Sequence, residues 1–124
     1  MDLDEGDVVT VERTFTPDQV RQFAEVTGDD GSHHLEADEQ GRVLVHGLLT
    51  ASMATEVGGS YDVLARTMEY RFHEPVYTGE RIRCDVELTT VEVHDRGTDV
   101  EAEVTWTRDG ETVLTGSFDG VIRD

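Results

Sequence analysis

Hydrophobic and polar positions divide the first forty residues into a short strand, a helix and a polar segment. Residues 8–15 are rich in β-branched side chains and predict a strand. Thr16 and Pro17 match the N-cap and first position of a helix, and apolar residues then recur at roughly helical spacing. We expect this helix to end at Gly28. Residues 29–42 are polar and interrupted by glycine, which predicts a loop or broken segment.

The least polar stretch of the chain, residues 43–57, predicts a buried helix. Its large apolar side chains recur at helical intervals, and Glu56 is its only charged residue. We expect the paired glycines Gly58 and Gly59 to end this helix.

The second half of the chain alternates between apolar and polar residues, as half-buried strands do. A connection at 74–80 and turns at 94–97 and 108–111 separate four predicted strands, which cover residues 63–72, 81–93, 100–106 and 112–122. The order of elements indicates an α+β fold, with one antiparallel sheet wrapped around one apolar helix. A chain of 124 residues has room for one core, so we assign residues 1–124 to a single domain.

The composition is strongly acidic. The formal net charge is −18, and all ten basic residues are arginine. Nucleic-acid phosphates would repel such a surface, so we expect no nucleic-acid partner. Because the acidic residues are spread along the whole chain, we interpret them as a halophilic feature, in which high salt screens their mutual repulsion.

Three further observations bound the setting of the protein. No window approaches the roughly 18 consecutive apolar residues of a membrane span, so we expect no membrane partner. The acidic start of the sequence lacks an apolar signal segment, which predicts a cytoplasmic protein. The single cysteine, Cys84, excludes an internal disulfide and a cysteine-based zinc site, and its alternating strand position predicts a small core residue.

Asp29 and His34 are the first candidates for chemistry. They lie five residues apart in the polar segment that follows the first helix. Carboxyl and imidazole groups exchange protons near neutral pH, which suits the addition of water to an activated double bond or its removal. The alternative interpretation is that Asp29 caps a turn and His34 is a surface loop residue.

Asp30 and His33 adjoin this pair and belong to residue types that ligate metals. No further ligand follows them at a recognisable spacing, so we predict no metal site. His73 and His94 are scattered along the chain, and we interpret them as solvated side chains.

His46 and Gly47 stand at the start of the apolar helical pattern. The N–H of Gly47 could point out from a helix N-terminus, where unpaired donors and the helix dipole favour negative charge. A thioester carbonyl placed there would have its enolate oxygen stabilised during reaction. The alternative is that Gly47 only permits close packing between helix and sheet.

Three segments resemble the MaoC-like (R)-specific enoyl-CoA hydratases. Residues 23–34 are similar to the hydratase signature of that family, Phe-Ala-x-x-Ser-Gly-Asp-x-Asn-Pro-x-His. Residues 45–52 resemble its Val-His-Gly-Met-Leu-x-x-Ser motif, and residues 72–80 resemble Phe-x-x-Pro-Val-x-x-Gly-Asp. The resemblance implies a hot-dog fold, in which a long sheet wraps around a central helix, and a homodimer.

The resemblance also implies roles for individual residues. Asp29 and His34 would hold one water molecule and add it syn across a trans-2-enoyl-CoA, while the N–H of Gly47 binds the thioester oxygen. His46 and Thr55 would complete the oxyanion and substrate-binding residues. No cofactor is implied, because coenzyme A or an acyl carrier is part of the substrate.

The chain departs from the family pattern in two places. Gly31-Ser32 replaces Asn-Pro in the loop that aims Asp29 and His34, and the segment between His34 and His46 is several residues shorter. We predict a dehydratase or enoyl-CoA hydratase acting on a 2-enoyl or 3-hydroxyacyl thioester. Two alternatives stay open: a hot-dog thioesterase that hydrolyses the thioester, and a non-catalytic protein that binds acyl thioesters.

Overall fold

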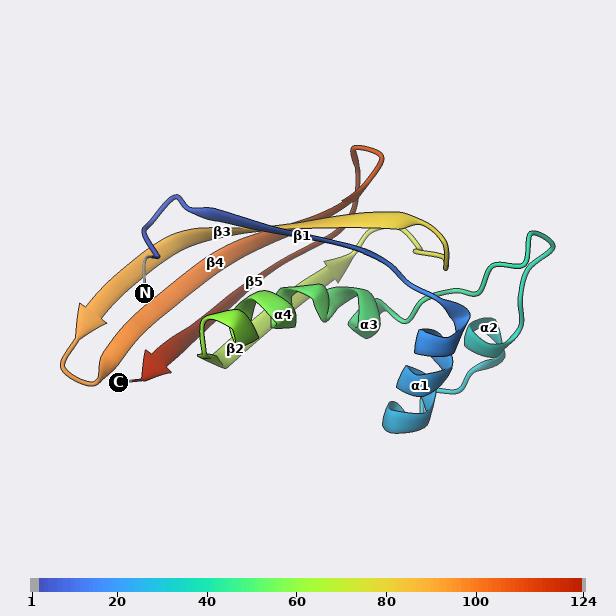
Figure 1. Ribbon diagram of the computed structural model, residues 1–124, viewed down its shortest axis with the longest axis horizontal. Helices are drawn as coiled ribbons and strands as arrows, with labels where there is room; N and C mark the ends of the chain where they lie inside the picture. Colours follow the sequence, from blue (N-terminus) through green and yellow to red (C-terminus); the bar gives the residue numbers. More distant parts are fainter. Residues whose placement is uncertain (1–2, 124) are drawn as a thin grey trace.

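The computed structural model describes residues 3–123, whose strands form one antiparallel sheet (Figure 1). Across the sheet the order is β1-β3-β4-β5-β2, so β1 and β2 are the outer strands. The strands are β1 (Val8–Thr14), β2 (Val63–Phe72), β3 (Arg81–His94), β4 (Gly97–Arg108) and β5 (Glu111–Arg123). In the turn between β4 and β5, Asp109 and Gly110 both adopt positive φ, which follows the twist of a two-residue hairpin.

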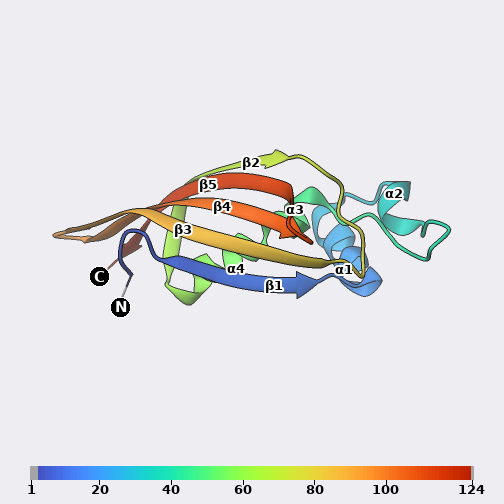
Figure 2. The same cartoon turned by 90° about the horizontal axis from the view of Figure 1, so that it is seen from above.

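Four helical segments lie beneath and beside the sheet: α1 (Pro17–Thr27), α2 (Ser32–Leu35), α3 (Gly47–Ala51) and α4 (Met53–Ser60). Seen from two directions, α3 and α4 run along one face of the sheet, while α1 and α2 lie at one end (Figures 1 and 2). Ser52 between α3 and α4 has helical backbone angles, so the two segments form one nearly continuous helix.

The core lies between this central helix and the sheet. β3 and β4 alternate between buried and exposed residues, so one face of each strand packs inward, and Met53, Ala54 and Val57 meet them from α4. Trp106, fully buried on β4, donates a hydrogen bond from Nε1 to the carbonyl of Thr50 at 3.0 Å. This bond ties α3 to the middle of the sheet.

The central helix begins and ends later than predicted. Residues 43–45 are extended and pair with the connection after β2, since the N–H of Val45 donates to the carbonyl of Val76 at 2.8 Å. The helix therefore starts at Gly47. It also continues through both glycines to Ser60, because a glycine costs a helix only about 1 kcal/mol and the turn falls at Asp62, which has positive φ.

The other predicted helices and strands agree with the structure to within a few residues. The α+β class, the four later strands and the first helix are confirmed. The polar segment 29–42 is irregular apart from the single turn α2. Cys84 is a buried free thiol, as predicted. Within residues 3–123, no helix has the length and apolar character needed to cross a membrane.

Candidate active site

α1 places the first part of the site. Its start is fixed by a capping box, in which Thr16 Oγ1 accepts from the N–H of Gln19 and the Gln19 side chain accepts from the N–H of Thr16. At its end, Gly28 takes the left-handed conformation and donates its N–H to Ala24 at 2.9 Å. The chain thereby turns out of the helix and leaves Asp29 at the edge of a cavity.

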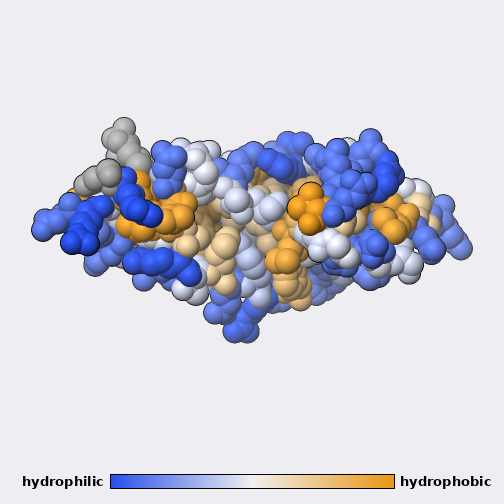
Figure 3. Space-filling view, turned by 90° about the horizontal axis from the view of Figure 1, so that it is seen from below, coloured by the Kyte–Doolittle hydropathy of each residue, from blue (hydrophilic) through white to orange (hydrophobic). Residues whose placement is uncertain are grey.

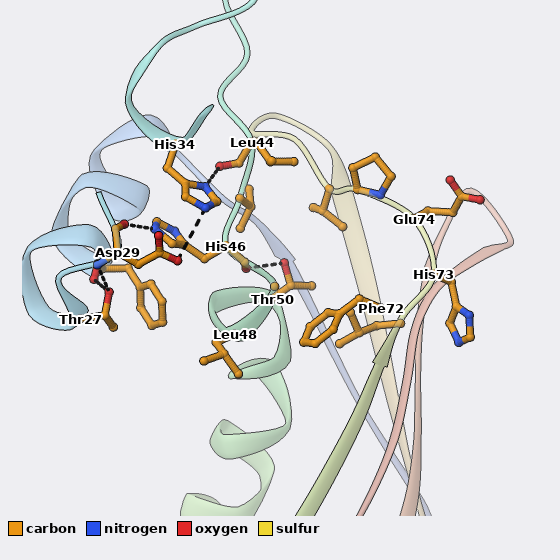
Figure 4. A pocket seen from close by; sticks show the side chains of 16 residues that line it. Thr27, Asp29, His34, Leu44, His46, Leu48, Thr50, Phe72, His73 and Glu74 are labelled. Carbon is orange, nitrogen blue, oxygen red and sulfur yellow. Dashed lines mark hydrogen bonds and ion pairs between the residues drawn. The ribbon is translucent and has the colours of Figure 1, made fainter. Parts of the chain in front are cut away.

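The single turn α2 brings His34 back over this edge. Its ring is buried, whereas the Asp29 side chain is 59% exposed. Nδ1 of His34 lies 2.8 Å from the carbonyl oxygen of Leu44. A carbonyl only accepts, so we assign a hydrogen to Nδ1, and in the neutral imidazole Nε2 then keeps its lone pair. Nε2 lies 3.8 Å from Oδ2 of Asp29, so two proton acceptors face each other across a short gap (Figure 4).

His46 is the N-cap residue of α3 and is only 2% exposed. Its Nε2 lies 2.8 Å from the main-chain carbonyl of Asp29, so Nε2 donates to that oxygen. Its ring stacks on the ring of His34 with centroids 3.6 Å apart and planes 15° apart. Residues from three elements thus meet in one compact group.

A cavity of about 580 Å³ opens beside this group. Asp29, His34, His46 and Gly47 all line it (Figure 4). Its other walls are mostly apolar and include Phe23, Leu44, Val45, Leu48, Phe72, Pro75, Val76 and Leu114. Apolar walls with a few polar groups at one side are typical of ligand-binding cavities.

Gly47 lies where the cavity meets the central helix. As the first residue of α3 it carries one of the N–H groups that have no acceptor within a helix. The ring of Phe72 covers this residue closely, because a Cβ added to Gly47 would lie 2.5 Å from Cε1 of Phe72. A ligand oxygen reaching the N–H would therefore pass beside the Phe72 ring.

Other candidates lie elsewhere or differ from the prediction. Thr55 is exposed on α4 and lines a separate groove beside β2, so the structure does not bring it to this cavity.

His73 and Glu74 line the cavity, on the side opposite Asp29 (Figure 4). The alternative in which His34 is a surface loop residue is wrong, because the ring is buried. Most of the apolar wall residues lie within the three segments that resemble the family, but sequence reasoning did not assign them to a cavity, because they come from distant elements.

Asp29, His34 and His46 also hold potential metal ligands within 4.8 Å of one another. The ring stack opposes their use together, because the lone pairs of the two imidazoles lie in two nearly parallel planes and do not converge on one point. The absence of a metal stays a prediction.

The sequence matches the profile of the MaoC like domain over residues 4–109, which is most of the chain. The chain belongs to the MaoC-like domain family. Its resemblance in three motifs is thereby confirmed at the level of the family. A comparison with proteins of curated function gave no match.

Solved structures confirm the hot-dog fold. An (R)-hydratase from A. caviae involved in PHA biosynthesis superposes with a TM-score of 0.82 at 22% identity, covering 95% of this chain and 96% of that one. R-hydratase PhaJ1 from Pseudomonas aeruginosa gives 0.81 at 18% identity, covering 98% and 83%. The HadBC (3R-hydroxyacyl-ACP dehydratase) complex from Mycobacterium tuberculosis gives 0.72 at 16% identity, covering 98% and 100%.

Proposed function

We propose that this MaoC-like protein is a hydro-lyase that adds water to a 2-enoyl thioester, or removes it from a 3-hydroxyacyl thioester. The observation that carries the proposal is the pair of proton acceptors, His34 Nε2 and Asp29 Oδ2, 3.8 Å apart at the edge of an apolar cavity. Two acceptors at this separation can each take one hydrogen of a single water molecule. The family and the (R)-hydratase structures support the same reaction class.

The proposed chemistry follows from these positions. The water oxygen bonds to C3 of the enoyl group while one of its protons passes to His34 Nε2, whose Nδ1–H is held by the Leu44 carbonyl. The electron pair of the double bond moves to the thioester oxygen, which the N–H of Gly47 stabilises as an enolate. A proton from the Asp29–His34 pair then bonds to C2, on the face where water entered. Dehydration follows the same steps in reverse.

The acyl chain would lie along the apolar wall, which Leu48, Phe72 and Leu114 contribute to. Coenzyme A or an acyl carrier would extend out of the cavity as part of the substrate, and we propose no other cofactor. We place the protein in a salt-rich cytoplasm on the basis of its net charge of −18.

We further propose that the protein works as a homodimer paired through β2. This strand is ten residues long, pairs with β5 alone within residues 3–123, and exposes nearly all its side chains. An unpaired edge with exposed apolar residues is a template for another strand. The face that carries α4 also shows hydrophobic patches between hydrophilic borders (Figure 3). Two of the similar structures are complexes by their titles, ChsH1-ChsH2 and HadBC.

The test is the loss of enoyl absorbance with crotonyl-CoA in concentrated KCl, with release of free thiol followed in parallel. We expect hydration by the wild type and a loss of roughly a hundredfold or more in both Asp29→Asn and His34→Ala. Exposed Asp30→Asn is the matched control and should retain activity. Activity that survives both substitutions would contradict the mechanism, thiol release with an intact double bond would indicate a thioesterase, and tight binding without turnover a binding protein.

A further inference from the structure

We propose that His46 is the positioning residue of this site. It contacts both members of the Asp29–His34 pair. Its Nε2 donates a hydrogen bond to the Asp29 carbonyl, and the face of its ring stacks on His34. The inference deepens the proposed function and rests on it for its catalytic consequence. His46 was expected to contact substrate, and its contacts assign it this different task.

The edge of the His46 ring holds Asp29. Nε2 donates to the Asp29 carbonyl at 2.8 Å, across seventeen residues of sequence. The other hydrogen bonds at this corner are local: the N–H of Asp29 donates to Thr27 Oγ1, and the N–H of Asp30 donates to the carbonyl of Gly28. The bond from His46 therefore connects the Asp29 corner to the central helix, whereas the others only shape the turn.

The face of the His46 ring holds His34. The two rings are nearly parallel, with centroids 3.6 Å apart. Phe23 also packs against His46, with centroids 4.9 Å apart, and His33 packs against His34 at 4.1 Å, both at tilted angles. Stacked on His46 and bonded to Leu44, the His34 imidazole keeps Nε2 directed at Asp29.

His46 is itself poorly placed to bind substrate. Its ring is 2% exposed and the hydrogen on Nε2 is engaged by Asp29. Nδ1 is buried and has no hydrogen-bond partner among the described residues. An unpaired buried acceptor lowers stability. Phenylalanine would stack without that cost but has no donor for Asp29, so the choice of histidine fits a ring that must stack and donate.

His46 contacts both ends of the segment from Asp29 to His34, which we expect from its sequence to be a loose loop. Gly31-Ser32 separates Asp29 from His34 in place of the Asn-Pro of the family signature. Reacting groups displaced by about 1 Å can lose about a hundredfold in rate. The two contacts of His46 tie both groups to the start of the central helix.

Three substitutions separate the two contacts. His46→Gln keeps a donor but loses the ring, His46→Phe keeps the ring but loses the donor, and His46→Ala loses both. We expect kcat to fall by roughly tenfold in each of the first two and by roughly a hundredfold in the third, with KM within about twofold of wild type. His94→Gln, on the β3–β4 hairpin, is the matched control and should change neither.

A double-mutant cycle distinguishes positioning from general damage to the fold. If the ring of His46 acts through His34, then His46→Gln, which loses the ring, should lower the residual rate of the His34→Ala variant by less than about twofold. An equal loss in both backgrounds would overturn the proposal, as would a KM that rises while kcat stays constant.

A measurement without substrate tests the placement directly. We expect the ¹⁵N NMR signals of His34 in the wild type to show one tautomer, with hydrogen on Nδ1, and in His46→Ala to show a mixture. Unchanged His34 signals in that variant would overturn the proposal. A wild type inactive on every acyl thioester would instead refute the proposed function, and the NMR result would still decide whether His46 positions His34.

Discussion

At the scale of single residues, Gly47 and Phe72 lie close together in the cavity wall. A Cβ on Gly47 would lie 2.5 Å from the Phe72 ring, which is 54% exposed and can swing outward. We predict that Gly47→Ala lowers kcat/KM by roughly tenfold, because the displaced ring or the methyl group obstructs the oxyanion position. Steady-state kinetics on Gly47→Ala, Phe72→Ala and the double variant measure this.

The double variant supplies the control. If the collision is the cause, adding Gly47→Ala to Phe72→Ala should cost much less than adding it to the wild type. Equal costs would show that the methyl group acts on the ligand and not through Phe72.

Cys84 gives a prediction about reactivity. Burial, followed by the nearby charges of Asp85 and Glu56, raises the pKa of its thiol to about 12. At about pH 8 the group is therefore a protonated, inaccessible thiol, whereas the thiolate is the reactive form. We predict no reaction with a disulfide reagent in the native state and one equivalent after unfolding, with Cys84→Ala as the blank. Rapid labelling of the folded protein would contradict this.

The site could be predicted from sequence only as far as chemistry follows from residue type and local spacing. Asp29 and His34 are five residues apart, so one glycine-broken turn can bring them together. The stack of His46 on His34 joins residues twelve positions apart, and no local rule gives the path of the chain between them. Thr55 was assigned from the resemblance to the family; it lines a separate groove, and its role stays a prediction.

At the scale of elements, α1 determines where Asp29 lies. Its capping box is formed by Thr16 and Gln19. We predict that Thr16→Ala lowers the free energy of unfolding by about 1 kcal/mol, because the N–H of Gln19 loses its acceptor, Thr16 Oγ1. Denaturant unfolding in constant KCl measures the change. Gln22→Ala, on the exposed side of the same helix, should leave stability within about 0.5 kcal/mol of wild type.

Strands were easier to predict than the limits of the central helix. Alternation along β3 and β4 is strict because one face of each packs on the core. Residues 43–46 carry the same apolar types as a helix, yet their backbone pairs with residues 76–78, some thirty positions away. Such a tertiary pairing overrides local pattern, and it sets the helix start at Gly47, next to the site.

At the scale of the whole molecule, β2 offers an exposed apolar edge for self-association. Leu64, Met68 and Phe72 are large exposed apolar residues of β2. We predict that Met68→Glu shifts the proposed dimer to monomer, since it places charge against a symmetry-related copy of the strand. Val93→Glu, on an exposed apolar residue of β3, should remain dimeric. Size exclusion coupled to light scattering in KCl gives the molar mass of the wild type and both variants. A monomeric wild type would contradict the proposed pairing through β2.

The net charge of −18 predicts that salt affects substrate binding, separately from any effect of salt on folding. Coenzyme A thioesters are anionic, and Asp29 and Glu74 are among the residues that line the cavity. No arginine lines it within residues 3–123. Salt shortens the range of this repulsion from about 10 Å at 0.1 M to about 3 Å at 1 M. We therefore predict that KM for crotonyl-CoA falls as KCl rises, over a range in which circular dichroism shows the protein folded.

An uncharged substrate separates repulsion from folding. The crotonyl thioester of N-acetylcysteamine presents the same enoyl group without phosphates, so its KM should change by less than about twofold over the same KCl range. If KM for both substrates fell in parallel, salt would be acting on the cavity itself. A salt effect confined to the coenzyme A thioester would show that the acidic surface repels the anionic substrate as it approaches. At that stage the electrostatic field of the whole molecule acts, before any single residue makes contact.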